Sequence, residues 1–257
     1  MLAWLFANTI FNTLSLYLLS ALVLVIAETV YFLFGFGSGL IAIGSLAHMI
    51  PDDLQSSVVL LLLVNLPLET ITVFRRRKII SWQGVLQLCL GIAIGIPCGG
   101  YILQWGKPMI VLAILGGFLI LVGIAFLLLP KGTAIKWPGW ASTFMGSMSG
   151  LLAGLFGTGG PPLIIYYRLS GMKREAFRGN LLAVFFLVTM VRAPTYGLMG
   201  LITLKRFYSA LAVFPAVVFG AVLGSSIHVQ IKETTFQRLV SAALMGIGCM
   251  LLMRRIL

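Results

Sequence analysis

Hydrophobic residues fill the chain in runs of about 20, the length of helix that crosses the hydrocarbon core of a bilayer. Short polar or glycine-rich stretches separate these runs. The pattern predicts an all-α, polytopic membrane protein with about eight transmembrane helices. Their approximate bounds are 20–50, 54–74, 82–103, 109–129, 140 to beyond the glycine-rich stretch at 156–162, 180–201, 207–229 and 236–253.

One short motif occurs twice along the chain. FGSG at Phe36–Gly39 recurs as FGTG at Phe156–Gly159, a shift of about 120 positions. The repetition predicts two four-helix membrane repeats, 20–129 and 140–257, with a linker at 130–139 and an N-terminal extension at 1–19. An even number of spans in each half favours parallel repeats, whereas a re-entrant segment at the motifs would make them inverted.

Each copy of the motif crowds glycines into an apolar run, and Pro161 and Pro162 follow the second copy. Such residues break a helix, and a break in lipid is tolerated only where protein or water satisfies the freed backbone groups. A helix that restarts there directs its amides and positive dipole end at the cavity. We therefore predict that the first helix of each repeat is broken around a solute; a pair of structural kinks is the alternative. The predicted solute-binding residues of the two breaks are Gly37, Ser38, Gly39, Gly157, Thr158, Gly159 and Gly160.

Composition excludes several classes of protein. Hydrophobic residues make up 60% of the chain and charged residues only 9%, too few to cover a soluble globule. A soluble enzyme, a nucleic-acid binder and a secreted disulfide scaffold are thereby excluded. The sequence has no nucleophile with a base, no metal motif and no phosphate loop, so we expect no enzymatic activity, cofactor or metal.

Most of the net charge of +12 lies between the apolar runs, where Lys and Arg set orientation. Placing the amino terminus in the cytoplasm groups Arg75–Lys78 with Lys205 and Arg206 on the cytoplasmic side. Asp53 and the basic cluster Arg168–Arg178 then lie on the opposite side. This grouping predicts that both termini are cytoplasmic.

Ionisable residues inside the spans are costly and often functional. Arg192 lies deep in the sixth span, where its guanidinium could bind an anion or neutralise Glu69. For Glu69 and Glu28, proton coupling or charge compensation is favoured, because carboxylates repel anions; Glu28 could also be a buried, protonated donor. Further predicted solute ligands are Asn65, Asn180 and Gln87, and the predicted entrance residues are Arg168 and Arg178.

Small residues at four-residue spacing have a different interpretation. Gly91, Gly95 and Gly99 share a helical face in the third span, as Gly220 and Gly224 do in the seventh. Small residues on one face let helix backbones approach closely within a membrane. We predict that these glycines pack helices rather than bind solute.

The two glycine-rich breaks and the four-plus-four repeat resemble the TauE/SafE sulfite exporter family, also called the toluene-sulfonate-uptake permease group. The resemblance covers the chain from about residue 20 onward. The second motif keeps the family's proline, as GTGGPPLII, whereas the first reads GFGSGLIAI. The resemblance implies a carrier of sulfite, organosulfonates or related anions in the bacterial inner membrane, working by alternating access. An anion channel and a carrier of small carboxylates are the alternatives, and a homo-oligomer stays open.

Overall fold

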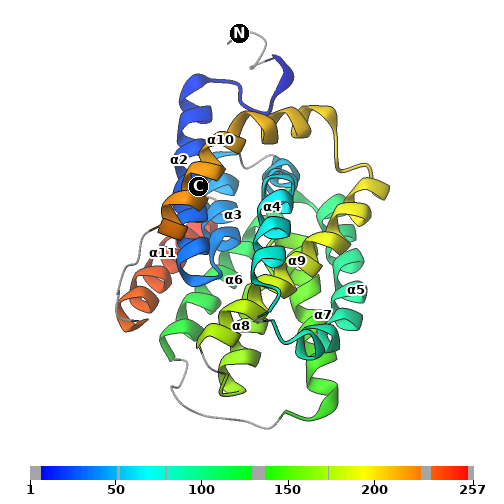
Figure 1. Ribbon diagram of the computed structural model, residues 1–257. Helices are drawn as coiled ribbons and strands as arrows, with labels where there is room; N and C mark the ends of the chain where they lie inside the picture. Colours follow the sequence, from blue (N-terminus) through cyan, green and yellow to red (C-terminus); the bar gives the residue numbers. More distant parts are fainter. Residues whose placement is uncertain are drawn as a thin grey trace.

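The computed structural model describes residues 7–50, 53–78, 80–128, 137–172, 174–226 and 233–253. Within these ranges the chain forms ten helices, labelled α2 to α11, and no extended strand. The helices pack side by side in one bundle (Figure 1). The first half of the chain forms α2 (Leu14–Phe34), α3 (Ser38–Met49), α4 (Leu54–Arg76), α5 (Trp82–Trp105) and α6 (Pro108–Leu128). The second half forms α7 (Gly139–Phe156), α8 (Gly160–Leu169), α9 (Arg174–Leu198), α10 (Leu204–Ser226) and α11 (Glu233–Met253).

Five of these helices are long and apolar enough to cross a membrane: α2, α4, α5, α9 and α10. Shorter apolar segments lie in α3, α6 and α11. Large hydrophobic side chains such as Leu90, Trp105 and Leu198 point outward, as expected for a surface in contact with lipid. The protein is therefore a multi-pass membrane protein, and the total of eight spans stays a prediction.

Two contacts define the two ends of the bundle. At one end Arg206, near the start of α10, bonds Asp53, the N-cap of α4, with an Nη2–Oδ1 distance of 3.1 Å. At the other end the Ser81 N–H, just before α5, donates to Asn180 Oδ1 of α9 at 2.8 Å. We call these the Asp53 end and the Asn180 end. Both contacts join the two halves of the chain.

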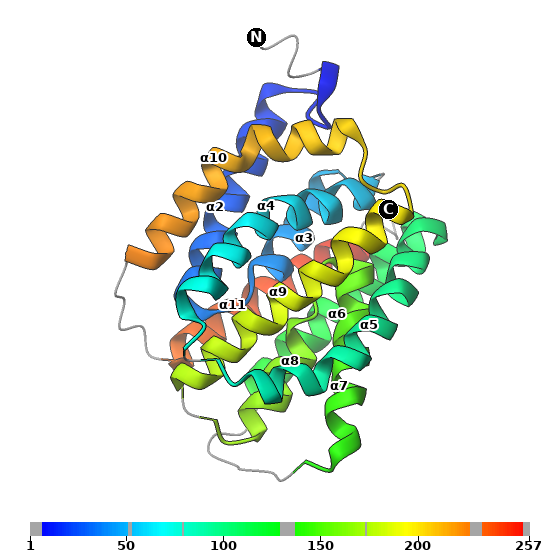
Figure 2. The same cartoon turned by 45° about the vertical axis from the view of Figure 1, so that its right-hand side comes forward.

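The chain turns back at the first glycine-rich break. The segment before α2 lies at the Asp53 end, because the Ile10 N–H donates to Ser209 Oγ of α10 at 2.9 Å. The end of α3 returns there, since it leads directly to Asp53. Helices α2 and α3 therefore form a hairpin (Figure 2).

The second break reverses the chain in the same way. Trp137, just before α7, donates its indole N–H to the carbonyl of Tyr166 in the last turn of α8 at 3.2 Å. The start of α7 and the end of α8 thus share the Asn180 end. The expectation of one broken helix that continues across the membrane is corrected at both motifs, and the re-entrant arrangement is the one found.

The positions of the charges correct the predicted grouping. Arg206 bonds Asp53, so the basic pair at the start of α10 lies with the acidic residue and not with Arg75–Lys78. The α4–α5 connection instead meets α9 close to its basic first turns, through Ser81 and Asn180. The hairpins α2–α3 and α7–α8 each reverse the direction of the chain. Every connection from α3 to α7 therefore lies on the side of the membrane opposite to the one expected for a chain without reversals.

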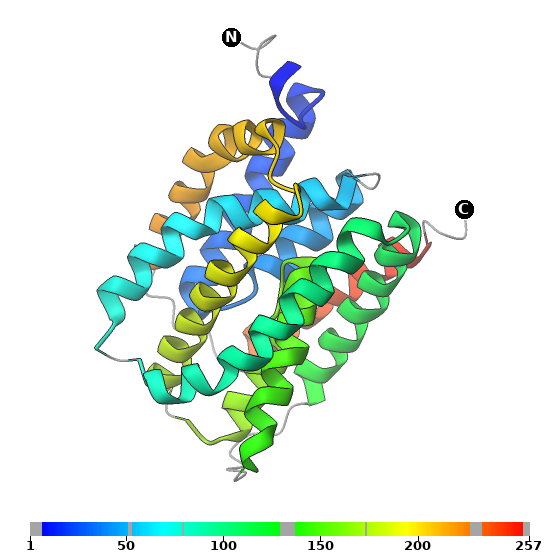
Figure 3. The same cartoon turned by 90° about the vertical axis from the view of Figure 1, so that its right-hand side faces the viewer.

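Glycine faces hold the closest helix pairs together. A Cβ atom on Gly91, Gly95 or Gly99 of α5 would overlap backbone atoms of α7. A Cβ atom on Gly220 or Gly224 of α10 would lie 2.6 Å and 2.5 Å from the carbonyl oxygens of Val25 and Thr29 in α2. The packing role predicted for these glycines is confirmed. In Figure 3, α5 runs beside α7 along most of its length.

Candidate functional site

Both breaks depend on left-handed backbone conformations. Helix α2 ends at Gly35 (φ 85°) and α3 begins after Gly37 (φ 105°). Helix α7 ends in the same way at Gly157 (φ 72°), whose N–H donates to the Ala153 carbonyl at 2.9 Å. Residues with a Cβ atom rarely adopt these φ values. The repeated glycine motif therefore encodes two helix reversals.

The two breaks touch each other. A Cβ atom on Gly39 would lie 2.8 Å from Thr158 Cβ and 3.2 Å from the Gly157 carbonyl oxygen. Because α3 begins at Ser38 and α8 at Gly160, the N-terminal ends of these two helices meet in the interior of the bundle. The free amides of α3 and the positive dipole ends of both helices face the same small region, to which the first turn of α8 adds the Gly160 N–H, since Pro161 and Pro162 have none.

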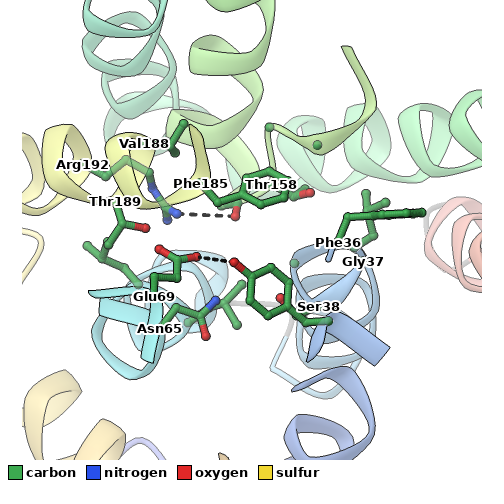
Figure 4. A pocket seen from close by; sticks show the side chains of 18 of the residues that line it. Phe36, Gly37, Ser38, Asn65, Glu69, Thr158, Phe185, Val188, Thr189 and Arg192 are labelled. Atoms are coloured by element: carbon green, nitrogen blue, oxygen red, sulfur yellow. Dashed lines mark hydrogen bonds between the residues drawn. The ribbon is translucent and has the colours of Figure 1, made fainter. Parts of the chain in front are cut away.

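A pocket occupies this meeting point (Figure 4). Its polar lining combines hydroxyl, amide, carboxyl and guanidinium groups from α4 and α9 with the two breaks. The polar and charged lining residues are Tyr31, Ser38, Asn65, Glu69, Thr158, Thr189 and Arg192. Its apolar lining includes Phe36, Leu61, Ile164, Phe185 and Val188. The pocket thus combines polar groups that could bind an ion with an apolar wall.

Arg192 supplies the pocket's positive side chain and is only 3% exposed. Its Nη1 donates to the Gly157 carbonyl at 3.4 Å and its Nη2 to the Val58 carbonyl at 3.3 Å, while the guanidinium lies 5.1 Å from the centre of the Tyr196 ring. Charge-assisted bonds to a carboxylate or sulfonate are typically about 2.7–2.9 Å. An anion could therefore replace two long bonds to neutral carbonyls with shorter ones.

Glu69 faces Arg192 across the pocket and accepts a hydrogen bond from the Tyr31 hydroxyl at 3.4 Å (Figure 4). No ion pair within 4.0 Å joins Glu69 and Arg192, two residues that the structure describes. Glu28 is fully buried on α2 and lies outside the lining of the pocket. Charge compensation of Glu69 by Arg192 stays a prediction, because the two side chains face each other across the pocket without a direct bond.

Most of the predicted solute ligands converge here. All seven predicted residues of the two breaks line the pocket together with Arg192, Asn65 and Glu69. Asn180 does not, because its amide links α9 to Ser81 and Met172. Gln87 is exposed on the outside of α5. The structure therefore does not bring these two predicted ligands to the pocket.

The predicted entrance residues lie at the Asn180 end. Arg178 donates from Nη2 to the Phe32 carbonyl in the last turn of α2. It also packs against Gly35, where an added Cβ atom would lie 2.9 Å from Arg178 Cγ. Arg178 thus supports the first break, and Arg168 is partly exposed in the last turn of α8.

Several lining residues were missed by the sequence analysis. Thr189 lies one turn before Arg192 and occupies, at a shift of 120 positions, the place that Glu69 has in the first half. That register could have identified it. Phe36 is the first residue of the repeated FGSG motif, whereas Tyr31 and Phe185 carried no signal, because an aromatic residue in an apolar span is ordinary. Among the described residues no group of three His, Cys, Asp or Glu side chains could hold a metal ion.

A polar pocket between two interrupted helices, buried within a multi-pass membrane protein, is typical of transporters. A family model described as "Sulfite exporter TauE/SafE" matches residues 20–251, and the chain belongs to this family. A protein from Cupriavidus necator named "Probable sulfite/organosulfonate exporter TauE" is 27% identical over 222 residues, which cover 85% of this chain and 87% of that protein. No solved structure matches the chain. Membership of an exporter family agrees with the expected transport role and not with an enzyme.

Proposed function

We propose that the protein is a secondary transporter of small anions, with sulfite and organosulfonates as its substrates, in the bacterial inner membrane. One observation carries this proposal: the N-terminal ends of α3 and α8 meet at one pocket beside the buried guanidinium of Arg192. Backbone amides, two helix dipoles and a fixed positive charge all favour an anion there. The name of the Cupriavidus necator relative supports the choice of sulfur oxyanions.

The lengths of the re-entrant helices favour a site near mid-depth. At 1.5 Å per residue, α3 is about 18 Å long and α8 about 15 Å long. Together they approach the roughly 30 Å thickness of the hydrocarbon core. Because each runs from the pocket toward a different end of the bundle, a solute at their meeting point would lie deep in the membrane.

The order of the helices supports alternating access. Segments α2–α6 and α7–α11 each consist of a re-entrant hairpin followed by three longer helices, and they begin at opposite ends of the bundle. We interpret the halves as inverted repeats. Inverted repeats allow two conformations of similar free energy that open a central site to opposite sides. The contacts at the Asp53 end and the Asn180 end join the halves and would alternately open.

The charges at the two ends favour an orientation opposite to the one predicted from the sequence. The Asn180 end gathers Arg75–Lys78 together with Arg168, Arg174 and Arg178, whereas Lys107, Lys205 and Arg206 lie at the Asp53 end, where Arg206 is paired with Asp53. The excess of Lys and Arg marks the cytoplasmic side. We therefore propose that the Asn180 end is cytoplasmic. Helix α2 would then begin, and helix α11 would end, on the outer side of the membrane.

Cysteine labelling tests this orientation in a background with Cys89, Cys98 and Cys249 replaced by Ser. A membrane-impermeant thiol reagent should label Lys205→Cys in intact cells and Lys78→Cys only after the membrane is opened. Lys107→Cys is the matched control for the Asp53 end and should behave like Lys205→Cys. Labelling of Lys78→Cys and Lys205→Cys from the same side would contradict the two hairpins.

A thermal-shift screen of the purified protein tests the substrate class. Sulfite and small alkylsulfonates should raise the midpoint of unfolding in a concentration-dependent way, because a ligand that binds only the folded state stabilises it. Sulfate and dicarboxylates serve as comparison anions. Stabilisation by dicarboxylates alone would replace the proposal with a carboxylate carrier, and stabilisation by no anion would contradict it.

A further inference from the structure

Two buried carboxyl groups, Glu69 in the pocket and Glu28 on α2, have few hydrogen-bond partners among the described residues. Glu28 is fully buried, and neither of its carboxyl oxygens has a hydrogen-bond partner among the residues that the structure describes. Glu69 is 4% exposed; its Oε1 accepts from Tyr31, and its Oε2 has no such partner in the same set of residues. An ionised carboxylate in this environment costs several kcal/mol.

Counting charges around the pocket shows how an anion can enter it. Arg192 contributes one positive charge, and the two glutamates contribute two negative charges if both are ionised. A monovalent anion would then change the net charge of the buried region from minus one to minus two. With both glutamates protonated, the anion and Arg192 neutralise each other.

The surroundings of the two glutamates contain few other charges. Glu69 is faced by Arg192 on α9 and by Tyr31 on α2, with the Thr189 hydroxyl beside it, and Glu28 is faced by Glu69. The other ionisable residues of the helices packed against them are near helix ends: Tyr17, His48, Asp53, Arg75, Arg76, Arg174, Glu175, Arg178, Lys205, Arg206 and Tyr208, with Tyr196 beneath the Arg192 guanidinium. No second arginine or lysine among the described lining residues offsets the pair.

We propose that Glu28 and Glu69 form a proton-binding pair that is filled together with the anion, so that the transporter moves protons and anion in the same direction. This inference rests on the proposed function. Each carboxylate takes up a proton from the surrounding water when the anion binds to the Arg192 guanidinium and the helix amides. Tyr31 lies one turn after Glu28 on α2, and its hydroxyl donates to Glu69.

Linkage gives the expected behaviour. If the protonated pocket binds the anion better, anion binding must take up protons by the same amount. Above the pH at which the pair ionises, the dissociation constant should rise by about tenfold per pH unit for each coupled proton.

Methanesulfonate is a suitable probe because it stays ionised over the whole working range of pH. The purified protein is titrated with it in weakly buffered detergent solution while a pH indicator reports proton uptake and calorimetry reports binding. At a pH above that at which the pair ionises, wild type should take up about one proton or more per bound anion. Glu69→Gln should bind methanesulfonate with less proton uptake and a flatter pH dependence, and Glu28→Gln provides the same test if Glu69→Gln does not fold. Glu175→Gln, in the first turn of α9, is the control and should keep the wild-type uptake.

The outcomes separate the two proposals. Binding without proton uptake at a pH above that at which the pair ionises would overturn the proton pair and leave the anion site intact. Binding that instead depends on sodium would show that the carboxyl groups hold a metal cation, which also overturns it. If methanesulfonate binds neither wild type nor any variant, the proposed organosulfonate site itself is contradicted.

Discussion

The two breaks share a backbone design and differ in the side chains that support them. In each, a helix ends at a left-handed glycine, Gly35 or Gly157, and a new helix starts toward the opposite side. The second break is braced by Arg192 and by Ser149, whose hydroxyl donates to the Gly159 carbonyl at 2.8 Å. The first is held by Arg178 through the Phe32 carbonyl.

This comparison separates what is repeated from what is unique. Both supporting arginines come from α9, in the second half, whereas the carboxyl group of the pocket comes from Glu69 on α4, in the first half. The repeated glycines create the cavity, and the charges that select its ligand are not repeated. Of the two arginines only Arg192 lines the pocket. The side chains of the second break should therefore control the affinity for the anion, and those of the first break the backbone geometry of the site.

The largest effect should come from filling either break. Gly159→Val would place its Cβ 2.5 Å from both the carbonyl oxygen and Oγ of Ser149, and Gly39→Val would push Thr158 away. Both variants should lose transport, because the helix amides can no longer approach the solute. The control is Gly197→Val on α9, where an added Cβ has no neighbour within 4 Å. Near-normal uptake by Gly159→Val in proteoliposomes would contradict a site at the breaks.

Substitutions of the two arginines should differ in their effects on anion affinity and thermal stability. Arg192→Lys keeps a positive charge and loses the planar fork, so the dissociation constant for the anion should rise by about ten- to over a hundredfold, equivalent to about 1.5–3 kcal/mol. Arg178→Lys should lower thermal stability and change affinity little. Equal losses of affinity in the two variants, measured by calorimetry, would show that both arginines act through the geometry of the breaks.

A double substitution tests whether Arg192 is only a counter-charge. Arg192→Ala should lower the free energy of unfolding by leaving buried carboxyl and carbonyl groups without their cation. Adding Glu69→Ala should recover stability and not anion binding. Recovery of binding in the double variant would assign Arg192 a structural role and leave the site to the helix amides.

The smallest expected effect concerns a glycine face far from the charges. Gly99→Ala in α5 would overlap the Leu151 carbonyl of α7 and should destabilise the protein by about 1–3 kcal/mol. Gly84→Ala lies in the same helix with its nearest neighbour at 3.6 Å and should be neutral or stabilising by up to about 1 kcal/mol. Equal unfolding temperatures for the two variants would contradict close packing of α5 on α7.

The sequence revealed the breaks because Gly37 and Gly157 adopt conformations that other residues avoid, and it revealed the spans because lipid demands long apolar runs. It could not show that the chain turns back at each break, since helix signals on both sides are the same for a kink and a hairpin. Because the reversals were not predicted, Arg206 and Asp53 were assigned to opposite sides of the membrane, whereas they lie at the same end of the bundle.

Gln87 shows a second limit of sequence patterns. It lies four residues before Gly91, but each four-residue step rotates about 40° around the helix axis. Toward the start of α5 the face that meets α7 has therefore shifted to Leu88, which lies against Gly146, and Gln87 is exposed. Residues such as Tyr31 and Thr189 reach the pocket only through tertiary packing of α2, α4 and α9.

Counterflow in proteoliposomes distinguishes a transporter with one site between the two breaks from a channel. Vesicles containing the protein are loaded with unlabelled methanesulfonate and diluted into a trace of labelled methanesulfonate. A transporter with one site between the two breaks should accumulate label transiently above the outside concentration, and Gly159→Val should abolish this while Gly197→Val preserves it. Entry of label that never exceeds the outside concentration would identify a channel, and equal accumulation by Gly159→Val and wild type would place the transport site elsewhere.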